Sequence, residues 1–265
     1  MKKIKRAIKR LFVISLIIFA LITAVSVHVA GSNGYSWYCV HVKNHVQPKC
    51  DKSFEFIQKY GGYYIDENHT DSTDDKVIYL TFDAGYENGN VEKILNVLKE
   101  QNVPAAFFVL GNLITKNQSL IQRMFDEGHL VCNHTYTHKS MVNKSAEEFK
   151  RELTALEDAC KELIGQDLDK YYRPPEGRFD EASLKYAQEM GYKTVFWSFA
   201  YADWDNNSQM SAEKAKSKIL ENIHNGEVML LHPTSSTNAE ILDEIIATLK
   251  SQGYRFGTLD ELCTN

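Results

Sequence analysis

From residue 76 onward, short apolar runs alternate with longer amphipathic stretches. This alternation predicts a strand for each run and a helix for each stretch. The runs are VIYLTF, AAFFVL, LVC, YYR, TVFW, VMLL and YRFGTL, and the predicted helices span residues 90–101, 117–127, 145–164, 180–190, 211–223 and 237–252. Because strands joined by helices pair in parallel, we expect an α/β fold. An incomplete (β/α) barrel of about seven strands is favoured, and a doubly wound open sheet is the alternative.

The first thirty residues have the features of a membrane-targeting segment. Residues 1–10 hold six Lys or Arg and no acid, and residues 11–27 are an uncharged apolar run. About 17 apolar residues is short for a spanning helix and long for the core of a cleaved signal. We favour a membrane anchor over a cleaved signal for residues 1–30. The rest of the chain is then extracytoplasmic, held at the cell membrane by a single pass or secreted to the cell wall.

The composition of the remaining chain bounds its organisation and its partners. Residues 31–75 are irregular and rich in Gly, Asn and Asp, so we expect a stalk and lead-in there and a globular domain over residues 76–265. Without the basic decapeptide, the chain has 24 basic and 35 acidic residues, a formal charge of about −11. This acidic balance argues against nucleic acid as a partner.

The five cysteines are too few for a disulfide scaffold in an exported protein of 265 residues. Cys39 and Cys50 flank a polar segment and could pair, and the sequence leaves that disulfide open. Cys132 lies in an apolar run and is expected to be a buried thiol.

Polar side chains follow several predicted strands at the point where each strand ends. Asp83 follows the first core run, Arg173 ends the YYR run before two prolines, Asp203 comes after TVFW, and His232 directly follows VMLL. Because the carboxyl ends of parallel strands meet at one edge, we expect these side chains to lie close together. Asp83 is a candidate base, and Arg173 is a suitable partner to keep that carboxylate ionised and aimed.

Two histidines four residues apart form a candidate metal site. His134 and His138 follow the LVC run, and their spacing is expected to point both rings the same way on one helical turn. Zinc is the leading candidate, because imidazole suits zinc and zinc lowers the pKa of a bound water to about 7.

These segments, in this order, resemble the polysaccharide deacetylase family, carbohydrate esterase family 4, over about residues 76–262. TFDAG is similar to the family's TFDDG, HTYTH to its H[ST]xxxH pair, RPPEG to its RPPYG-like segment, AYADW to its DxxDW, and LLH to its closing Leu-x-His. The resemblance implies metal-dependent hydrolysis of an amide that removes acetate from an N-acetylated sugar. Residues 76–265 would be the catalytic domain.

Two positions depart from the family pattern. Ala84 stands where the family has a second aspartate, its third metal ligand, and Glu176 stands where it has an aromatic residue. With these changes, TFDAGYENG, RPPEGRF and FWSFAYADW are similar to the delta-lactam-biosynthetic de-N-acetylases of spore-forming bacteria. Those enzymes act on N-acetylmuramic acid in peptide-free peptidoglycan, which implies a role in making muramic delta-lactam in the spore cortex. A water, a substrate oxygen or another side chain would complete the metal shell.

The resemblance also implies a role for each residue of the site. Asp83 would take the proton of the attacking water as general base, and His232 would protonate the departing amine as general acid. Arg173 would orient Asp83, while Asp203 would hydrogen-bond His232 and keep it protonated.

Three further residues are expected to contact the peptidoglycan glycan strand. Arg178 has the right charge to anchor a lactyl carboxylate, and Tyr86 and Trp204 are candidates for binding the sugar. A peptidoglycan amidase would have to remove the stem peptide first.

Two alternatives remain open. The chain could be an N-acetylglucosamine or chitin-type deacetylase, against which Ala84 and Glu176 speak. It could also be a catalytically silent wall-binding protein that lost its metal with the aspartate, although such a protein needs neither an acid nor a base.

Overall fold

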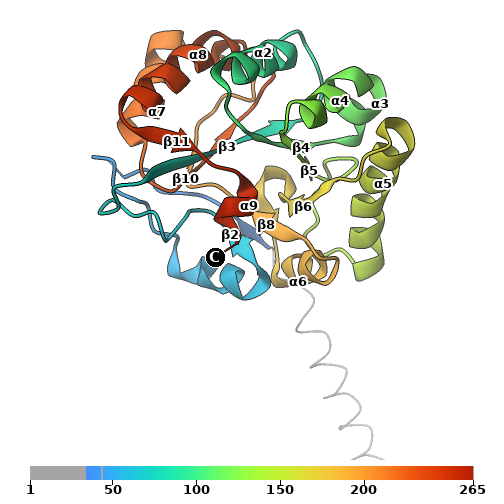
Figure 1. Cartoon of the computed structure of the whole chain (residues 1–265). Helices are drawn as coiled ribbons and strands as arrows, with labels where there is room; N and C mark the ends of the chain where they lie inside the picture. Colours follow the sequence, from blue (N-terminus) through green and yellow to red (C-terminus); the bar gives the residue numbers. More distant parts are fainter. Residues whose placement is uncertain (1–33, 43, 265) are drawn as a thin grey trace, which may run out of the picture. The chain divides into compact units, whose positions relative to one another are not determined.

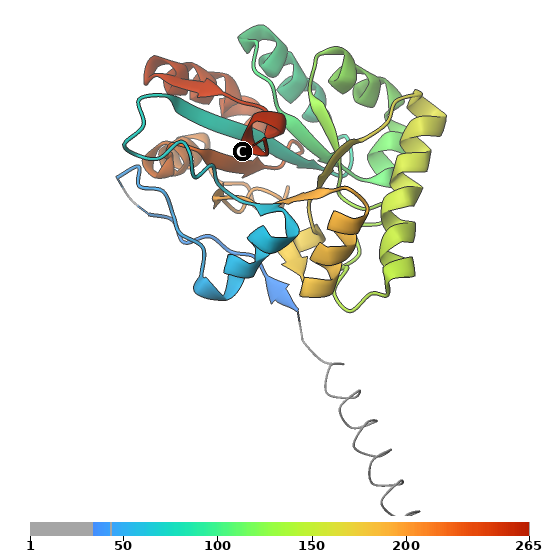
Figure 2. The same ribbon diagram turned by 60° about the horizontal axis from the view of Figure 1, so that its bottom comes forward.

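The computed structural model describes residues 34–42 and 44–264, and Figures 1 and 2 show it from two directions. The predicted membrane segment, residues 1–30, lies outside these described residues. Within them, no helix combines the length and the apolar character that a membrane span requires. Residues Tyr35–Asn265 form one compact unit.

Nine strands of the described residues form one sheet in which every ladder is parallel. They are β2 (Gly62–Tyr63), β3 (Lys76–Ala84), β4 (Ala106–Val109), β5 (Leu130–Asn133), β6 (Asp169–Tyr172), β8 (Lys193–Val195), β9 (Phe199–Ala200), β10 (Glu227–Leu231) and β11 (Tyr254–Phe256). A separate antiparallel pair joins β1 (Tyr35–Ser36) to β7 (Arg178–Phe179).

The strand order identifies a half-barrel. Across the sheet it is β2-β8-β6-β5-β4-β3-β10-β9, and β11 also pairs with β3. Strands β3, β4, β5, β6 and β8 follow one another in chain order, and the late strands β10 and β11 pair with β3, as in a barrel; a doubly wound sheet instead reverses its strand order midway along the chain. A bridge between Ile65 and Glu227 brings the segment after edge strand β2 to the start of β10. The half-barrel of parallel strands is thus confirmed over the open-sheet alternative.

The helices lie in an arc outside the strands (Figure 1). They are α2 (Val91–Gln101), α3 (Gly111–Lys116), α4 (Gln118–Asp126), α5 (Ala146–Ile164), α6 (Glu181–Glu189), α7 (Ala212–Asn222) and α8 (Ser236–Ser251), with η1 (Lys52–Tyr60), η2 (Pro175–Gly177) and α9 (Leu259–Leu262) elsewhere in the unit. Each predicted helix has a counterpart with similar bounds, whereas α3 was not predicted. Helix α5 begins at a capping box of Ser145 and Glu148, which satisfies backbone N–H groups that the first turn leaves free.

The side chains of β3 alternate between two apolar clusters. Ile78, Leu80 and Phe82 pack outward against the helices, whereas Val77 and Tyr79 face the inside of the half-barrel together with residues of α9. By the same alternation, Asp83 belongs to the inner face.

Residues 35–75 do not form the stalk that their composition predicts. Trp37, Phe54 and Ile57 are buried in one cluster with Phe179 and Phe196, and β2 is a strand of the main sheet. Burying the aromatic and aliphatic side chains of this segment stabilises the fold. This stabilisation keeps the segment packed on the domain despite its irregular, polar composition. The boundary at residue 76 therefore does not separate two compact parts.

The structure also bears on three of the cysteines. Cys39 and Cys50 are free thiols, so the disulfide that the sequence left open is not present. Cys132 is fully buried, as expected from its apolar run. Burial raises the pKa of the Cys39 thiol to about 12, so this thiol is protonated at neutral pH.

The packing of residues 35–75 predicts that Phe54→Ala lowers the free energy of unfolding by about 3–5 kcal/mol, the range for truncating a buried aromatic side chain. The matched control is Val40→Ala in the same segment. Val40 is 61% exposed, and its substitution should change stability by less than about 0.5 kcal/mol. Urea unfolding of both variants measures the difference. Equal, small effects would mean that this segment is a stalk after all.

Candidate active site

A cleft of about 640 Å³ opens where the strands end. Because β3, β5, β6, β8 and β10 are parallel, their carboxyl ends bring distant residues to this one edge. The lining includes four residues that the sequence singled out for chemistry or metal binding, along with an acidic side chain and several aromatic ones. The lining residues used below are Asp83, Tyr86, His134, His138, Glu176, Gly177, Trp197, Trp204 and His232.

Arg173 holds Asp83 from beneath the cleft. Arg173 is fully buried, and its Nη1 donates to Asp83 Oδ1 at 2.8 Å. Three more of its N–H groups donate to Val195 O at 2.9 Å, Thr81 Oγ1 at 2.9 Å and Phe196 O at 3.2 Å. The guanidinium also lies 4.1 Å from the centre of the Phe108 ring. A buried charge is tolerated when it is paired and hydrogen-bonded in this way.

The position of Asp83 keeps its carboxylate ionised. Burial alone raises the pKa of the carboxyl, but the charges of His134 and Arg173 more than offset burial, and the pKa lies below its ordinary value. Burial lowers the pKa of His134 itself to about 4. Because His134 is then neutral, the cation hydrogen-bonded directly to Asp83 at neutral pH is Arg173.

His134 is neutral and has a defined tautomer. Its Nδ1 lies 2.8 Å from Arg173 O, and because a carbonyl oxygen only accepts, Nδ1 carries the proton. The unprotonated Nε2 lies 3.5 Å from Asp83 Oδ2. This is the state in which an imidazole binds a metal ion.

His138 lies beside His134, although not on the helical turn that the spacing predicted. The two ring centroids are 4.9 Å apart. Residues 134–138 form a bend in which Thr135 and His138 have φ of 70° and 60°, and the N–H of His138 donates to Thr135 Oγ1 at 3.0 Å. Asn133 supports the bend, because its Oδ1 accepts from the N–H of Thr135 at 2.9 Å. These side-chain acceptors replace helical hydrogen bonds.

The residues present fit a metal ion in part. The neutral, oriented imidazole of His134 and the adjacent ring of His138 provide two suitable ligands. Ala84 is fully buried and packs in the apolar cluster outside the sheet. Among residues 34–42 and 44–264, no group of three or more His, Cys, Asp or Glu side chains is arranged to hold a metal ion.

Asp203 binds His232 and favours its protonated form. His232 Nδ1 donates to Asp203 Oδ1 at 2.7 Å, and its backbone N–H donates to Asp203 Oδ2 at 2.8 Å. Burial alone lowers the pKa of the imidazole, but the hydrogen bond and the charge of Asp203 reverse this, and the pKa lies above its ordinary value. Asp203 is 1% exposed, so its charge acts with little screening by water.

Asn238 is a part of this arrangement that the sequence analysis missed. Its Nδ2 donates to Asp203 Oδ2 at 2.6 Å and to His232 O at 3.1 Å, and the hydroxyl of Tyr201 donates to its Oδ1. Asn238 lies on the buried face of α8 with Ile241, Leu242 and Ile245. A buried amide on an otherwise apolar helix face is the signal that could have revealed it.

The walls of the cleft carry aromatic and acidic groups. Tyr86 and Trp204 line it and are 43% and 60% exposed. The Trp204 ring lies 6.1 Å from that of His232. Glu176 also lines the cleft, in a left-handed conformation with φ of 57°.

Arg178 is not brought to the cleft. It is exposed and lies in β7, opposite Ser36 of β1, and it is absent from the cleft lining within the described residues. The lining contains no Lys or Arg at all in this part of the chain. The structure therefore places Arg178 away from the cleft in which it was expected to act.

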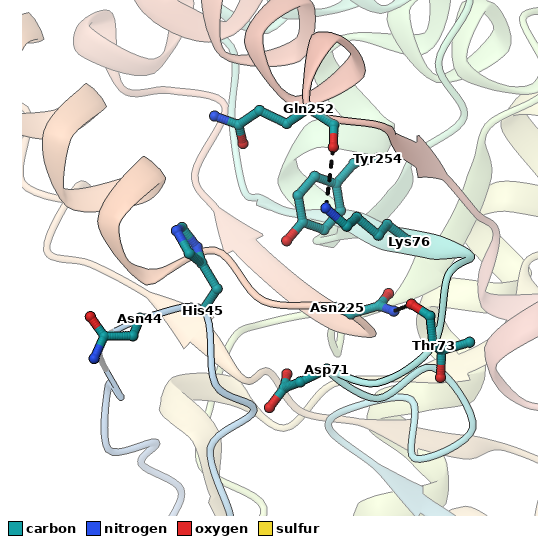
Figure 3. Close-up of a pocket in the computed structure, with 8 residues that line it drawn as sticks. All are labelled: Asn44, His45, Asp71, Thr73, Lys76, Asn225, Gln252 and Tyr254. Carbon is teal, nitrogen blue, oxygen red and sulfur yellow. Dashed lines mark hydrogen bonds between the residues drawn. The ribbon is translucent and has the colours of Figure 1, made fainter.

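A second hollow, of about 490 Å³, lies at the opposite edge of the sheet (Figure 3). It is lined by residues at the starts of strands, among them Lys76 and Tyr254. Its polar groups mostly bind nearby backbone: Asn225 Nδ2 donates to Thr73 O, Lys76 Nζ to Gln252 O, and His45 Nδ1 to Ile223 O. We assign these groups to holding loops together.

The two carboxylate–cation pairs suit proton transfer at one cleft. Asp83 is an ionised acceptor whose orientation Arg173 fixes, and His232 is an imidazole whose orientation Asp203 fixes and whose protonated form Asp203 favours. An ionised base and a protonated acid that face the same cleft can take a proton from a water and give one to a leaving group.

Comparison with known proteins gives consistent results. Residues 70–195 match the family model for polysaccharide deacetylase. The chain is 40% identical to the peptidoglycan-N-acetylmuramic acid deacetylase PdaA of Bacillus subtilis over 86% of this chain and 85% of that protein. It is 35% identical to a peptidoglycan-N-acetylglucosamine deacetylase of Bacillus cereus over 70% of this chain and 67% of that protein. The solved structure of Bacillus subtilis PdaA, a family 4 carbohydrate esterase, matches with a TM-score of 0.81 and 39% identity, over 87% of this chain and 97% of that one.

The geometry around Asp203 predicts that Asp203→Asn lowers the pKa of His232, because the substitution removes the charge that raises it. NMR titration of the imidazole measures the change, and Asp205→Asn, an exposed position in the same loop, is the matched control. The wild-type pair stabilises the fold fully below the ordinary histidine pKa, and this contribution is lost as the pH rises through the raised pKa. An unchanged His232 pKa in Asp203→Asn would contradict this account.

Proposed function

Because the chain belongs to the polysaccharide deacetylase family, we propose that it hydrolyses the N-acetyl group of N-acetylmuramic acid in peptide-free peptidoglycan. The family makes it a deacetylase, a hydrolase of an amide bond, and its relatives indicate peptidoglycan as the substrate. The product would lead to muramic delta-lactam in the spore cortex. The observation that carries the finer assignment is the 40% identity, over 86% of the chain, to a relative named for N-acetylmuramic acid.

Asp83 acts in this proposal as the general base. Its Oδ1 is engaged by Arg173, which leaves Oδ2, near His134, to accept a proton from the attacking water. Its lowered pKa keeps the carboxylate free of a proton before the reaction. Arg173 orients the base and does not itself contact the sugar, because it is fully buried.

His232 acts as the general acid. Asp203 occupies its Nδ1, so Nε2 is the nitrogen left to donate a proton to the departing amine. The raised pKa keeps the ring protonated to higher pH than an ordinary histidine. Asn238 supports the acid indirectly, because its amide donates to the second oxygen of Asp203, and Tyr201 in turn donates to Asn238 Oδ1.

His134 and His138 would hold the divalent metal that deacetylases of this family use, and we propose zinc. When bound, zinc polarises a carbonyl oxygen and lowers the pKa of a water. The neutral state and fixed tautomer of His134 suit this role. With Ala84 in the apolar cluster, the chain offers one carboxylate fewer than the family pattern, so weak metal affinity is expected.

The second candidate substrate is N-acetylglucosamine, and one observation favours it. The cleft lining of the described residues holds no Lys or Arg, and Glu176 adds a carboxylate. A neutral sugar is not repelled by this carboxylate, whereas the lactyl carboxylate of muramic acid would lie near like charge. The Bacillus cereus relative is named for N-acetylglucosamine.

We further propose that the chain works outside the cytoplasm, with residues 1–30 as a membrane anchor or a cleaved signal. The support is the basic and then apolar sequence of that segment. A peptide-free glycan also requires an amidase that removes the stem peptide beforehand.

Acetate release by the full-length chain in detergent, with zinc or with a chelator, tests the substrate. We expect acetate from peptide-free glycan and less from peptide-bearing glycan, with release stopped by the chelator. Mass spectrometry should locate the lost acetyl on muramic acid. Loss from glucosamine instead would overturn the muramic assignment in favour of the second candidate.

The roles of the two central residues predict that Asp83→Ala and His232→Ala each reduce kcat by at least about a hundredfold, the range for losing a general acid or base. Assays at saturating zinc measure the loss, and thermal unfolding verifies that both variants are folded. Asp205→Asn serves as the control for removing a nearby surface charge. Activity within tenfold of wild type in either alanine variant would show that the residue is not the general acid or base, since about 10²-fold is the lower end of that range.

A further inference from the structure

Trp37 lies directly behind two loops that form one wall of the cleft. Its backbone N–H donates to Gly177 O at 2.8 Å, and its indole Nε1–H donates to Trp197 O at 2.9 Å. Gly177 and Trp197 both line the cleft, whereas Trp37 does not. Each N–H group of Trp37 thus binds a different segment of the wall.

The two loops follow different strands and meet at close range. Gly177 lies in η2, which follows β6, and Trp197 follows β8. A Cβ built on Gly177 would lie 2.7 Å from the Trp197 ring and 3.2 Å from the Cβ of Trp37. No side chain fits there without displacing the indole of Trp197 or Trp37 itself. The distance between the two loops therefore depends on the position of the Trp37 side chain.

The loop that carries Gly177 has an unusual backbone. Glu176 and Gly177 have φ of 57° and 64°, two successive left-handed residues, of which only glycine adopts this conformation readily. Such a conformation persists when the surroundings determine it. The bond from Trp37 to Gly177 O, together with the pairing of Tyr35 with Phe179, holds this segment on both sides. In Figure 2, β1 is the blue arrow beside β7 at the lower edge of the unit.

Trp37 is itself fixed by aromatic packing. It is 5% exposed, stacks on Phe196 with centroids 4.5 Å apart and planes at 24°, and contacts Phe54 and Tyr64 at 5.5 and 5.1 Å. A tryptophan in such a cluster is rigid. Rigidity and two directed N–H groups are the properties that a residue needs in order to fix other groups in place.

We propose that Trp37 is a positioning residue of the active site, which sets the spacing of the Gly177 and Trp197 loops and thereby the fit of the sugar. This inference rests on the proposed deacetylase function for its kinetic test. It assigns residues ahead of the predicted catalytic domain to the construction of the cleft. The effect should appear in substrate binding, because neither Asp83 nor His232 contacts Trp37.

Trp37→Phe tests the proposal in the full-length chain. The variant keeps the aromatic packing and the backbone N–H but loses the indole donor to Trp197 O. We expect KM for peptidoglycan glycan to rise by about fivefold, the effect of losing one neutral hydrogen bond, with kcat changed by less than about twofold. Hydrogen–deuterium exchange of residues 196–199 should become faster.

Leu184→Ala is the matched control. Leu184 is fully buried in the same cluster, and its truncation lowers the melting temperature by leaving a cavity. If Trp37 had only a structural role, both variants would have a lower melting temperature, and the two variants would have similar KM values. A KM within about twofold of wild type in Trp37→Phe, or an equal rise in Leu184→Ala, overturns the proposal, since losing one hydrogen bond is expected to change KM by more than that.

The exchange measurement separates this inference from the proposed function. If the wild-type chain releases no acetate from any glycan, the proposed function has failed, and exchange alone then decides the role of Trp37. Faster exchange of residues 196–199 in Trp37→Phe but not in Leu184→Ala supports the positioning role. Equal exchange in the two variants overturns it.

Discussion

The ion pair between Arg173 and Asp83 is the interaction on which the site depends. Arg173 is fully buried, and an unpaired guanidinium there would cost several kcal/mol. The half-barrel offsets this cost because it brings the ends of β3 and β8 next to the end of β6. Asp83, Thr81 and two backbone carbonyls there accept hydrogen bonds from Arg173. The carbonyl of Arg173 also fixes the tautomer of His134. One residue thus orients both the proposed base and a proposed metal ligand.

The pKa values of two histidines in the cleft are shifted in opposite directions. His134 is buried and donates only to a carbonyl, so its pKa falls to about 4 and the ring stays neutral. His232 donates to the buried carboxylate of Asp203, so its pKa rises. The same side chain is therefore suited to the proposed role of a ligand in one position and of an acid in the other, because the acceptor at its Nδ1 differs in charge.

The charge of the cleft lining bears on whether the substrate sugar carries a carboxylate, a property that differs among members of the family. The identity to a muramic acid deacetylase supports a substrate that carries a carboxylate, yet the described lining offers Glu176 and no Lys or Arg. Arg173 is committed to Asp83 beneath the surface. A lactyl carboxylate would therefore depend on His232, on the metal or on solvent for its counter-charge. The N-terminal segment contributes to the same cleft through Trp37, so the cleft is built from more of the chain than its motifs indicate.

The sequence by itself determined the strands, the helices and the positions of the reactive residues along the chain. The spacing of apolar residues and the residues that begin or end helices are local properties of the sequence. The rule that parallel strands end at one edge was then enough to bring Asp83, Arg173, Asp203 and His232 together. Tertiary structure alone decided the rest. Asn238 and Trp37 act through contacts across 35 and 160 residues, Arg178 turned away into the β1–β7 pair, and the histidine pair took a left-handed bend. These outcomes depend on which distant acceptor each group meets, and no local pattern encodes that.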